Sequence, residues 1–350
     1  MSATQAVMPW VACITSRTQA RCRQAQLAAQ GSQEPMQRYI LRRLLLTIPT
    51  LIGVTVLVSA MLYSLPGDTV SMMMQDYGGY AKDVADLRHK LGLDRPFYEQ
   101  YLSWASHVVR GDLGTSLRDN SSITDDLSKK VPVTVELGVF SLVVALLISI
   151  PLGVYSAVRQ DTLSDYIARS TAIAMLAVPG FWLATLAITM PSIWWSWTPP
   201  LRYTQFIDDP GKNLAQMFLP AIILGIGLSG ALTRLTRAQM LEVLRQDYVR
   251  TARSKGLAEL YVVFRHALKN ALIPVVTLLG LQVAVLVSGT VVLENIFVVP
   301  GMGRYLLDAI TNRDYPIVQA VVLIFSALIL FSNLIVDITY AWLDPRIRYG

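Results

Sequence analysis

Long uncharged apolar runs alternate along the chain with shorter charged segments. A helix that spans a membrane needs about 20 mostly apolar residues, because the hydrocarbon core is about 30 Å thick. Runs of about that length occur at 44–65, 137–158, 170–193, 213–233, 271–293 and 315–336. One such run could be a buried helix of a soluble protein, but six could not. The pattern therefore predicts an all-α integral membrane protein with six transmembrane helices.

Composition supports this prediction. The chain has 350 residues, of which 53% are hydrophobic and 15% charged, and its mean hydropathy is +0.45. Soluble domains carry about 25% charged residues. The net charge of +6 and pI of 9.3 could suggest nucleic acid as a partner. We expect membrane lipid and no nucleic acid, because many of the basic residues sit beside apolar runs.

The distribution of basic residues predicts the orientation. If the N-terminus is inside, the four inner segments carry three, two, eight and two Lys or Arg residues, whereas the short outer loops carry four in total. The positive-inside rule then places both termini in the cytoplasm. Residues 1–35 are expected to form a disordered or loosely held tail. The long first outer loop, 66–131, has helix-like apolar spacing and predicts a folded cap, which either receives a partner protein or only seals the pore mouth.

The inner loop 234–270 is long and patterned. Its first part, LTRAQMLEVLRQDYVRTARSKG, has apolar residues at helical spacing and ends on Lys255-Gly256. Glycine tolerates the left-handed conformation that ends many helices, and a cation in the last turn is favourable. A second helix is expected from Glu259 to Asn270. A short helix presented in this way fits a groove on another protein.

An ordered set of motifs resembles the permeases of ABC importers. YVRTARSKGLAELYVVFRHALKNALIPVV is similar to their EAA loop, and more narrowly to that of the dipeptide, oligopeptide and nickel permeases. LPGDTV, LGLDRPFYEQY, GDLGTSL, PVTVELG, VPGFWLA, ENIFVVPGMGRYLLDAI, RDYPIVQ and DITYAWLDPRIRYG also resemble this family. The resemblance covers about residues 36–350. It implies a type I importer permease with six transmembrane helices and a large extracytoplasmic loop after the first.

In this family the inner loop forms a coupling helix that docks on an ATPase subunit. The resemblance gives that role to Asp247, Tyr248, Arg250, Thr251, Ala252, Lys255, Gly256 and Leu257. Two positions depart from the family pattern. Arg250 stands in place of the EAA glutamate, and Lys269 stands in place of a proline. A salt bridge from that glutamate to the ATPase is therefore not expected.

The resemblance also implies partners in the cytoplasmic membrane. They are a homologous second permease subunit, two ATP-binding ATPase subunits and an extracytoplasmic solute-binding protein. No G-x-x-x-x-G-K-[ST] sequence occurs in the chain, so ATP and Mg are expected on the partners and no cofactor on this chain. Peptides are the expected cargo, with nickel chelates and oligosaccharides as alternatives. A secondary ion-coupled transporter is a further alternative, although clear inverted repeats and intramembrane charges are not seen.

Some residues within the spans are candidates for the translocation path. Pro179 and Gly180 adjoin in the third span, where two helix breakers together predict a functional kink. Gln282 lies in the middle of the fifth span and could face the pore or bond to another helix. Gly225, Gly227 and Gly230 in the fourth span predict a face for close helix packing.

The outer turn before the sixth span contains Pro300, Gly301 and Gly303. It either shapes the outer mouth or is an ordinary proline–glycine turn. No metal site is expected, because the three histidines lie outside the spans and no HExxH spacing occurs. No catalytic residue is expected either, because the chain has no GxSxG motif.

Overall fold

The computed structural model describes residues 36–64, 70, 86, 88–89, 92–200 and 202–343, so residues 1–35 and part of the predicted cap lie outside it. Its named elements are all helices. They are α2 (Met36–Ser64), α5 (Phe97–Val109), α6 (Ile123–Val158), α7 (Leu163–Ala177), α8 (Gly180–Trp195), α9 (Pro210–Leu244), α10 (Asp247–Ser254), α11 (Glu259–Tyr261), the π-helical turn η1 (Val262–Ala267), α12 (Leu268–Ile296), α13 (Met302–Thr311) and α14 (Tyr315–Leu343).

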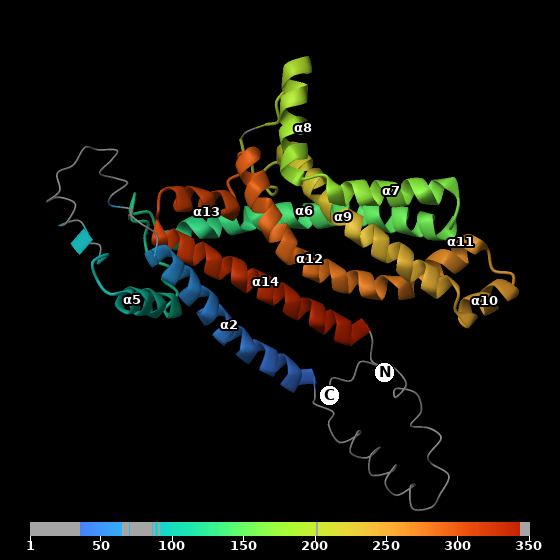
Figure 1. Ribbon diagram of the computed structural model, residues 1–350, viewed down its shortest axis with the longest axis horizontal. Helices are drawn as coiled ribbons and strands as arrows, with labels where there is room; N and C mark the ends of the chain where they lie inside the picture. Colours follow the sequence, from blue (N-terminus) through green and yellow to red (C-terminus); the bar gives the residue numbers. More distant parts are fainter. Residues whose placement is uncertain are drawn as a thin grey trace, which may run out of the picture.

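Five helical runs among the described residues are long and apolar enough to cross a membrane. They lie in α2, in α6, in α9, in the continuous run of α11, η1 and α12, and in α14. The pair α7 and α8 gives a sixth if it is counted as one broken span. Figure 1 shows α2, α6, α9, α12 and α14 running lengthwise through the molecule. The prediction of an all-α integral membrane protein is therefore confirmed.

Helices α6 and α9 extend well beyond the predicted second and fourth spans. They contain 36 and 35 residues, which corresponds to about 50 Å each, compared with a hydrocarbon core of about 30 Å. The Ser122 side chain accepts a hydrogen bond from the Asp125 N–H at the start of α6, and Asp209 accepts one from the Lys212 N–H in α9. These caps satisfy helix ends in polar sequence, so the helices begin before the apolar runs.

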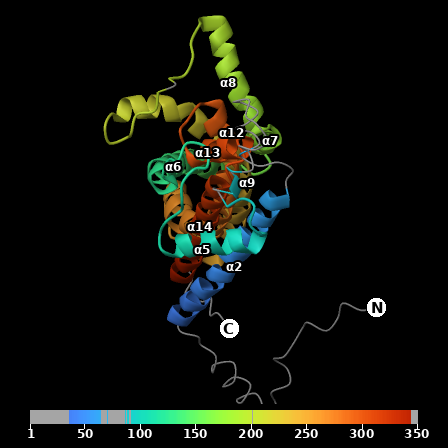
Figure 2. The same cartoon turned by 90° about the vertical axis from the view of Figure 1, so that its left-hand side faces the viewer.

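The predicted third span, 170–193, is divided into two helices. α7 and α8 meet at an angle of 91°. Val178 between them is extended, as residues before proline usually are, and Pro179 has no N–H to continue the helix. The kink predicted at Pro179-Gly180 is therefore a break, and α8 projects away from the other helices (Figures 1 and 2).

Helix packing is densest between α6 and α9. A Cβ atom on Gly225 would lie 2.7 Å from a Val144 side-chain carbon in α6, and one on Gly230 would lie 2.7 Å from the Ala172 carbonyl oxygen in α7. Glycine at these two positions therefore lets the helices approach closely. Gly227, the third residue of the predicted packing face, has open space at its Cβ position and does not take part.

The described part of the outer cap is attached to two spans. α5 crosses in front of α2 and α14 in Figure 2, and the Tyr101 hydroxyl lies 3.0 Å from that of Thr55 in α2. The loop after α5 contacts the residue before α14, because the Asp314 carboxylate accepts a 2.7 Å hydrogen bond from the Ser116 hydroxyl. This part of the cap is therefore folded against the spans, and its role as a partner site or a seal stays a prediction.

Candidate functional site

The loop between α9 and α12, residues 245–267, contains every residue that the sequence assigns to coupling. Gln246 is extended, with φ −70° and ψ 149°, so the chain turns before α10 begins. The helix expected to continue up to Lys255 is therefore interrupted, and that expectation is wrong at this point. Asp247 occupies the first turn of α10, where an acidic side chain interacts favourably with the helix dipole.

The predicted glycine turn is present at the end of α10. Gly256 has a φ of +76°, in the left-handed region, and its N–H donates a 2.9 Å hydrogen bond to the Arg253 carbonyl. Lys255 is the C-cap residue and donates to the Thr251 carbonyl at 3.1 Å. No heavy atom lies within 4 Å of a Cβ placed on Gly256. The backbone conformation, and not crowding, therefore requires glycine here.

A small apolar core fixes α10 to the rest of the loop. Val249 and Ala252 are buried and pack with Val262 of η1, while Val243 and Leu244 at the end of α9 lie against them. Burying this face orients the other side of α10 outward. Ala252 is therefore a packing residue of the loop and not an exposed contact.

Two polar contacts add to this core. Arg253 donates to both carboxylate oxygens of Glu259, at 3.1 and 2.7 Å, so the pair closes across the glycine turn. The Glu259 carboxylate raises the pKa of the Arg253 guanidinium, which stays charged. The Tyr248 hydroxyl accepts a 2.7 Å hydrogen bond from the Asn270 amide at the start of α12. Together these contacts hold α10 in one position relative to α11 and α12.

Other residues of the loop are exposed, and many of them have large apolar side chains. The set that we call the exposed loop face consists of Tyr248, Arg250, Thr251, Lys255, Leu257, Leu260, Tyr261 and Phe264. Exposed apolar side chains gathered on so short a segment are typical of a protein–protein contact. Sequence analysis did not single out Leu260, Tyr261 and Phe264. A signal was available, because all three lie within two residues of Val262, which belongs to the loop's own core.

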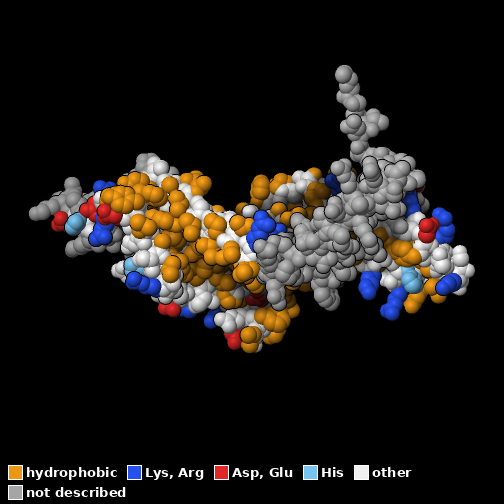
Figure 3. All heavy atoms as spheres, turned by 90° about the horizontal axis from the view of Figure 1, so that it is seen from below, with side chains coloured by type: hydrophobic (Ala, Val, Ile, Leu, Met, Phe, Trp, Pro, Cys, Tyr) orange, Lys and Arg blue, Asp and Glu red, His pale blue; other side chains and the backbone are white. Residues whose placement is uncertain are grey.

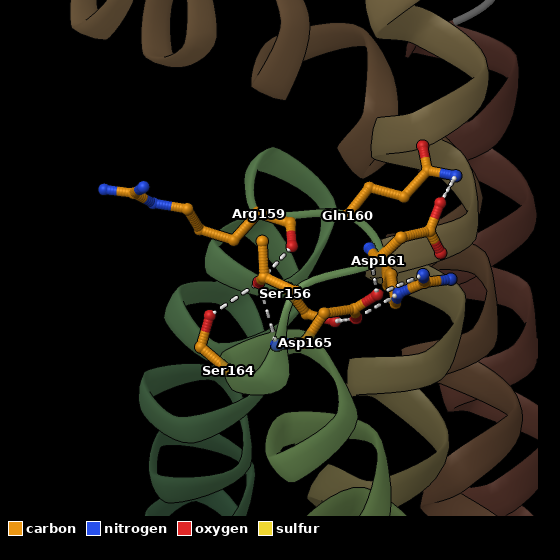
Figure 4. A network of polar contacts seen from close by, with 8 residues as sticks. Ser156, Arg159, Gln160, Asp161, Ser164 and Asp165 are labelled. Atoms are coloured by element: carbon orange, nitrogen blue, oxygen red, sulfur yellow. Dashed lines mark hydrogen bonds and ion pairs between the residues drawn. The ribbon is translucent and has the colours of Figure 1, made fainter.

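A buried ion pair joins α6, α7 and α9 near this loop, and sequence analysis missed it (Figure 4). The Asp165 carboxylate is fully buried and accepts hydrogen bonds from Arg237 Nε at 2.9 Å and Nη2 at 2.8 Å. It also accepts from the Ser156 hydroxyl at 2.5 Å and from the Asp161 N–H at 3.0 Å. Each carboxylate oxygen thus receives two donors, and the buried charge is fully satisfied.

The local sequence around this pair indicates only a helix start. The Thr162 hydroxyl accepts a hydrogen bond from the Asp165 N–H, so Thr-x-x-Asp is typical of an N-terminal cap. Arg237 lies 72 residues from Asp165 along the chain. In the sequence it is only one of the basic residues that indicate the orientation. The contact helps to fix the position of the loop, because Arg237 lies seven residues before the end of α9, which then leads into α10.

The other predicted path residues lie on separate helices. Pro179 and Gly180 are exposed at the bend between α7 and α8, and a Cβ on Gly180 would meet open space. Gln282 is half-buried in α12. The bend is a structural fact, whereas a gating role for these three residues stays a prediction.

The outer turn is built around a buried carboxylate. Glu294, near the end of α12, accepts hydrogen bonds from the Thr134 hydroxyl at 2.7 Å and from the Arg304 N–H at 3.0 Å. Pro300 leads into Gly301 and Gly303 at the start of α13, and a Cβ on Gly301 would overlap the Glu294 carboxylate. The glycines are therefore needed for close approach to Glu294, a residue that sequence analysis missed.

Comparison with known proteins assigns the family. Residues 149–349 match the family described as "Binding-protein-dependent transport system inner membrane component", and residues 36–138 match the N-terminal region of such membrane components. The chain belongs to this family. The first match contains the exposed loop face, the Asp165–Arg237 pair and the glycine turn before α13.

Named relatives of this permease align over most of their length. The dipeptide transport system permease protein DppB of Escherichia coli K12 is 40% identical over 337 residues, covering 90% of this chain and 99% of the relative. The di/tripeptide permease DppB of Pseudomonas aeruginosa is 40% identical over 334 residues, with the same coverage. The oligopeptide permease AppB of Bacillus subtilis is 41% identical over 320 residues, covering 90% of this chain and all of the relative. Because its relatives are transport permeases, the chain is a pore subunit and not a catalytic one.

Replacing Gly301 by alanine in this permease is expected to lower thermal stability. The added methyl group would overlap the Glu294 carboxylate, which is fully buried and bonded to Thr134. Overpacking of this kind typically costs about 1–3 kcal/mol. The melting temperature of the purified permease measures the effect. Gly227→Ala is the matched control, because its Cβ would meet open space; equal melting temperatures for the two variants would contradict the expectation.

Proposed function

We propose that this chain is the permease subunit of an ATP-driven importer that moves di- or oligopeptides inward across the cytoplasmic membrane. The observation that carries the proposal is near full-length similarity to three permeases named for dipeptide, di/tripeptide and oligopeptide transport. The aligned length is 90% of the chain in each case, so the similarity is not confined to a single motif.

The exposed loop face is the proposed docking site for a separate ATPase subunit. Its support is the arrangement of α10, whose apolar side is buried in the loop while the side chains of Tyr248 and Arg250 are exposed. ATP and Mg bind to the partner subunit in this proposal. The loop then transmits the partner's motion to α9 and α12 as a rigid body, which changes the pore between two states.

The remaining partners are proposed from the same family resemblance and from exposed surfaces. A homologous second permease completes the pore as a heterodimer, supported by α8, in which Phe181, Trp182 and Ile193 are exposed and Ala184 is buried. A second ATPase docks on that permease. An extracytoplasmic solute-binding protein delivers the peptide on the side of α5 and α13. Both termini are cytoplasmic in this arrangement, as the distribution of basic residues favours.

Reconstitution tests the proposal. The chain is placed in proteoliposomes with the second permease, the two ATPase subunits and the binding protein, and uptake of a labelled dipeptide is measured. We expect uptake only when ATP is present on the ATPase side and the binding protein is on the other side. Omitting the ATPase subunits is the control. Ion-driven uptake by the chain alone would instead support a secondary transporter, and uptake of a nickel chelate or oligosaccharide in preference to peptide would overturn the proposed cargo.

A further inference from the structure

Helix α5 is attached to α2 at a level where α2 is still within the membrane. The Tyr101 hydroxyl lies 3.0 Å from that of Thr55, and the ring centroids of Phe97 and Tyr63 are 5.8 Å apart. Thr55 and Tyr63 belong to the part of α2 that can cross a membrane, which ends at Ser64. Thr55 lies nine residues before that end, which corresponds to about 14 Å along the helix. These contacts therefore hold α5 at the boundary between the hydrocarbon core and the headgroups.

The length, direction and composition of α5 suit this boundary. It has 13 residues, whereas a spanning helix needs about 20, and it runs across α2 and α14 instead of alongside them (Figure 2). Tyrosine and tryptophan are enriched at membrane interfaces, and α5 contains Tyr98, Tyr101 and Trp104. A short helix in this position resembles the helices that lie in the plane of an interface.

One side of α5 is apolar and uncovered. Tyr98, Leu102, Ala105 and Val109 follow one another at spacings of four, three and four residues, which places them on a single face of the helix. We call these four residues the apolar stripe of α5. Tyr98, Leu102 and Val109 are 60%, 63% and 88% exposed, so the stripe is not used to pack α5 against the rest of the chain.

The polar residues of α5 lie away from the stripe. By helical spacing they occupy the sector on its far side, beyond the face that packs against α2. Several of them line a cavity of about 510 Å³ between α5 and the ends of α2 and α14. The cavity-lining polar residues of α5 include Glu99, Gln100, Ser103 and His107. The helix is therefore amphipathic, and its exposed apolar residues are separated from its polar ones.

The apolar stripe is on a molecule whose neighbouring surface is already suited to lipid. Leu57 and Met61, in the last turns of the α2 span, are 59% and 62% exposed. α2 and α5 lie at the lower edge of Figure 1, and Figure 3, which views the molecule from below, shows a broad apolar surface there. An amphipathic helix at an interface buries its apolar face about 5–10 Å into the boundary of headgroups and acyl chains. An uncharged stripe at the end of a span matches that environment.

We propose that α5 is an interfacial membrane helix, and that its apolar stripe is buried among the lipids of the leaflet in which α2 ends. The sequence predicted a cap that either receives a partner protein or seals the pore mouth, and the proposal gives the stripe a different partner, the lipid surface. It goes beyond the proposed function, because it depends neither on the solute nor on which side of the membrane is cytoplasmic.

Quenching of a fluorophore by lipid tests the proposal. The full-length permease with Cys13→Ser and Cys22→Ser receives one new cysteine, Leu102→Cys in the stripe or Ser106→Cys as the matched control on the same helix. Both positions are exposed, so the label displaces no packed side chain. The labelled proteins are reconstituted in phosphatidylethanolamine–phosphatidylglycerol vesicles, in which some lipids carry a nitroxide on the acyl chain near the headgroup. We expect at least twofold stronger quenching at position 102 than at position 106.

Two results would overturn the interfacial helix. One is quenching at position 102 that is equal to or weaker than quenching at position 106, because α5 would then stand in water or face another way. The other comes from the assembled transporter in membranes, where a photo-crosslinking residue replaces Leu102. A lipid adduct is expected, whereas an adduct to the second permease or to the binding protein would show that a protein covers the stripe. Neither measurement involves peptide uptake, so their failure is separate from failure of the proposed function.

Discussion

Replacing Gly256 by proline is expected to leave the permease inserted in the membrane but to uncouple ATP hydrolysis from peptide uptake. Gly256 has a φ of +76°, whereas proline fixes φ near −65°. Proline also removes the N–H that bonds to the Arg253 carbonyl. The turn must then change, and α10 loses its position relative to α11. We expect uptake in proteoliposomes to fall by at least tenfold while ATP hydrolysis by the partners continues.

Matched substitutions separate the backbone effect from loss of contacts. Gly256→Asn should retain most of the uptake, because asparagine tolerates the left-handed conformation better than other non-glycine residues. Arg253→Gln should reduce uptake only slightly, because an exposed ion pair such as Arg253–Glu259 contributes about 0–1 kcal/mol. Normal uptake by Gly256→Pro would refute the coupling role of the turn. If the Gly256→Pro protein were absent from the membrane fraction, the expectation that insertion does not require the turn would be refuted.

The features that the sequence predicted well are those imposed locally. A membrane requires about 20 apolar residues per span, so charge-free runs identify the spans without any tertiary information. Gly256 was predictable for the same reason, because a left-handed residue after a helix strongly favours glycine. The true starts of α6 and α9 were not predicted. They depend on the caps Ser122 and Asp209, which lie in polar segments outside the apolar runs.

The features that the sequence did not reveal depend on contacts between distant segments. Glu294 and Thr134 are 160 residues apart, and neither is unusual in its local sequence. Their meeting explains why glycine occurs at position 301, which sequence analysis could assign only to a turn. The break at Gln246 is a further case, because no proline or glycine marks it. Apolar spacing continues across that residue, and the extended conformation is settled by packing of α10 on η1.

Replacing Asp165 by alanine is expected to be among the most destabilising single changes in the permease. The Asp165 carboxylate is fully buried, and the Arg237 side chain is only 20% exposed. Removing one partner of a buried pair leaves an uncompensated charge and typically costs about 3–5 kcal/mol. The melting temperature and the yield of folded protein in detergent measure the effect. Arg159→Ala is the control, since Arg159 lies at the end of α6, close in sequence to Asp165, but is exposed.

A double substitution shows whether the pair acts only in folding or also in transport. Asp165→Leu with Arg237→Met removes both charges at similar volume, and such replacements are often neutral or stabilising. We expect the double variant to recover much of the stability that Asp165→Ala loses; an equally unstable double variant would show that the unpaired charge is not the cause. If the stable double variant hydrolyses ATP but takes up no peptide, the pair transmits motion. It would do so because α9 carries both Arg237 and the connection to α10, while Asp165 lies in the first turn of α7, the helix that ends at the Pro179 bend. Full uptake by the double variant would restrict the pair to holding α7 and α9 together.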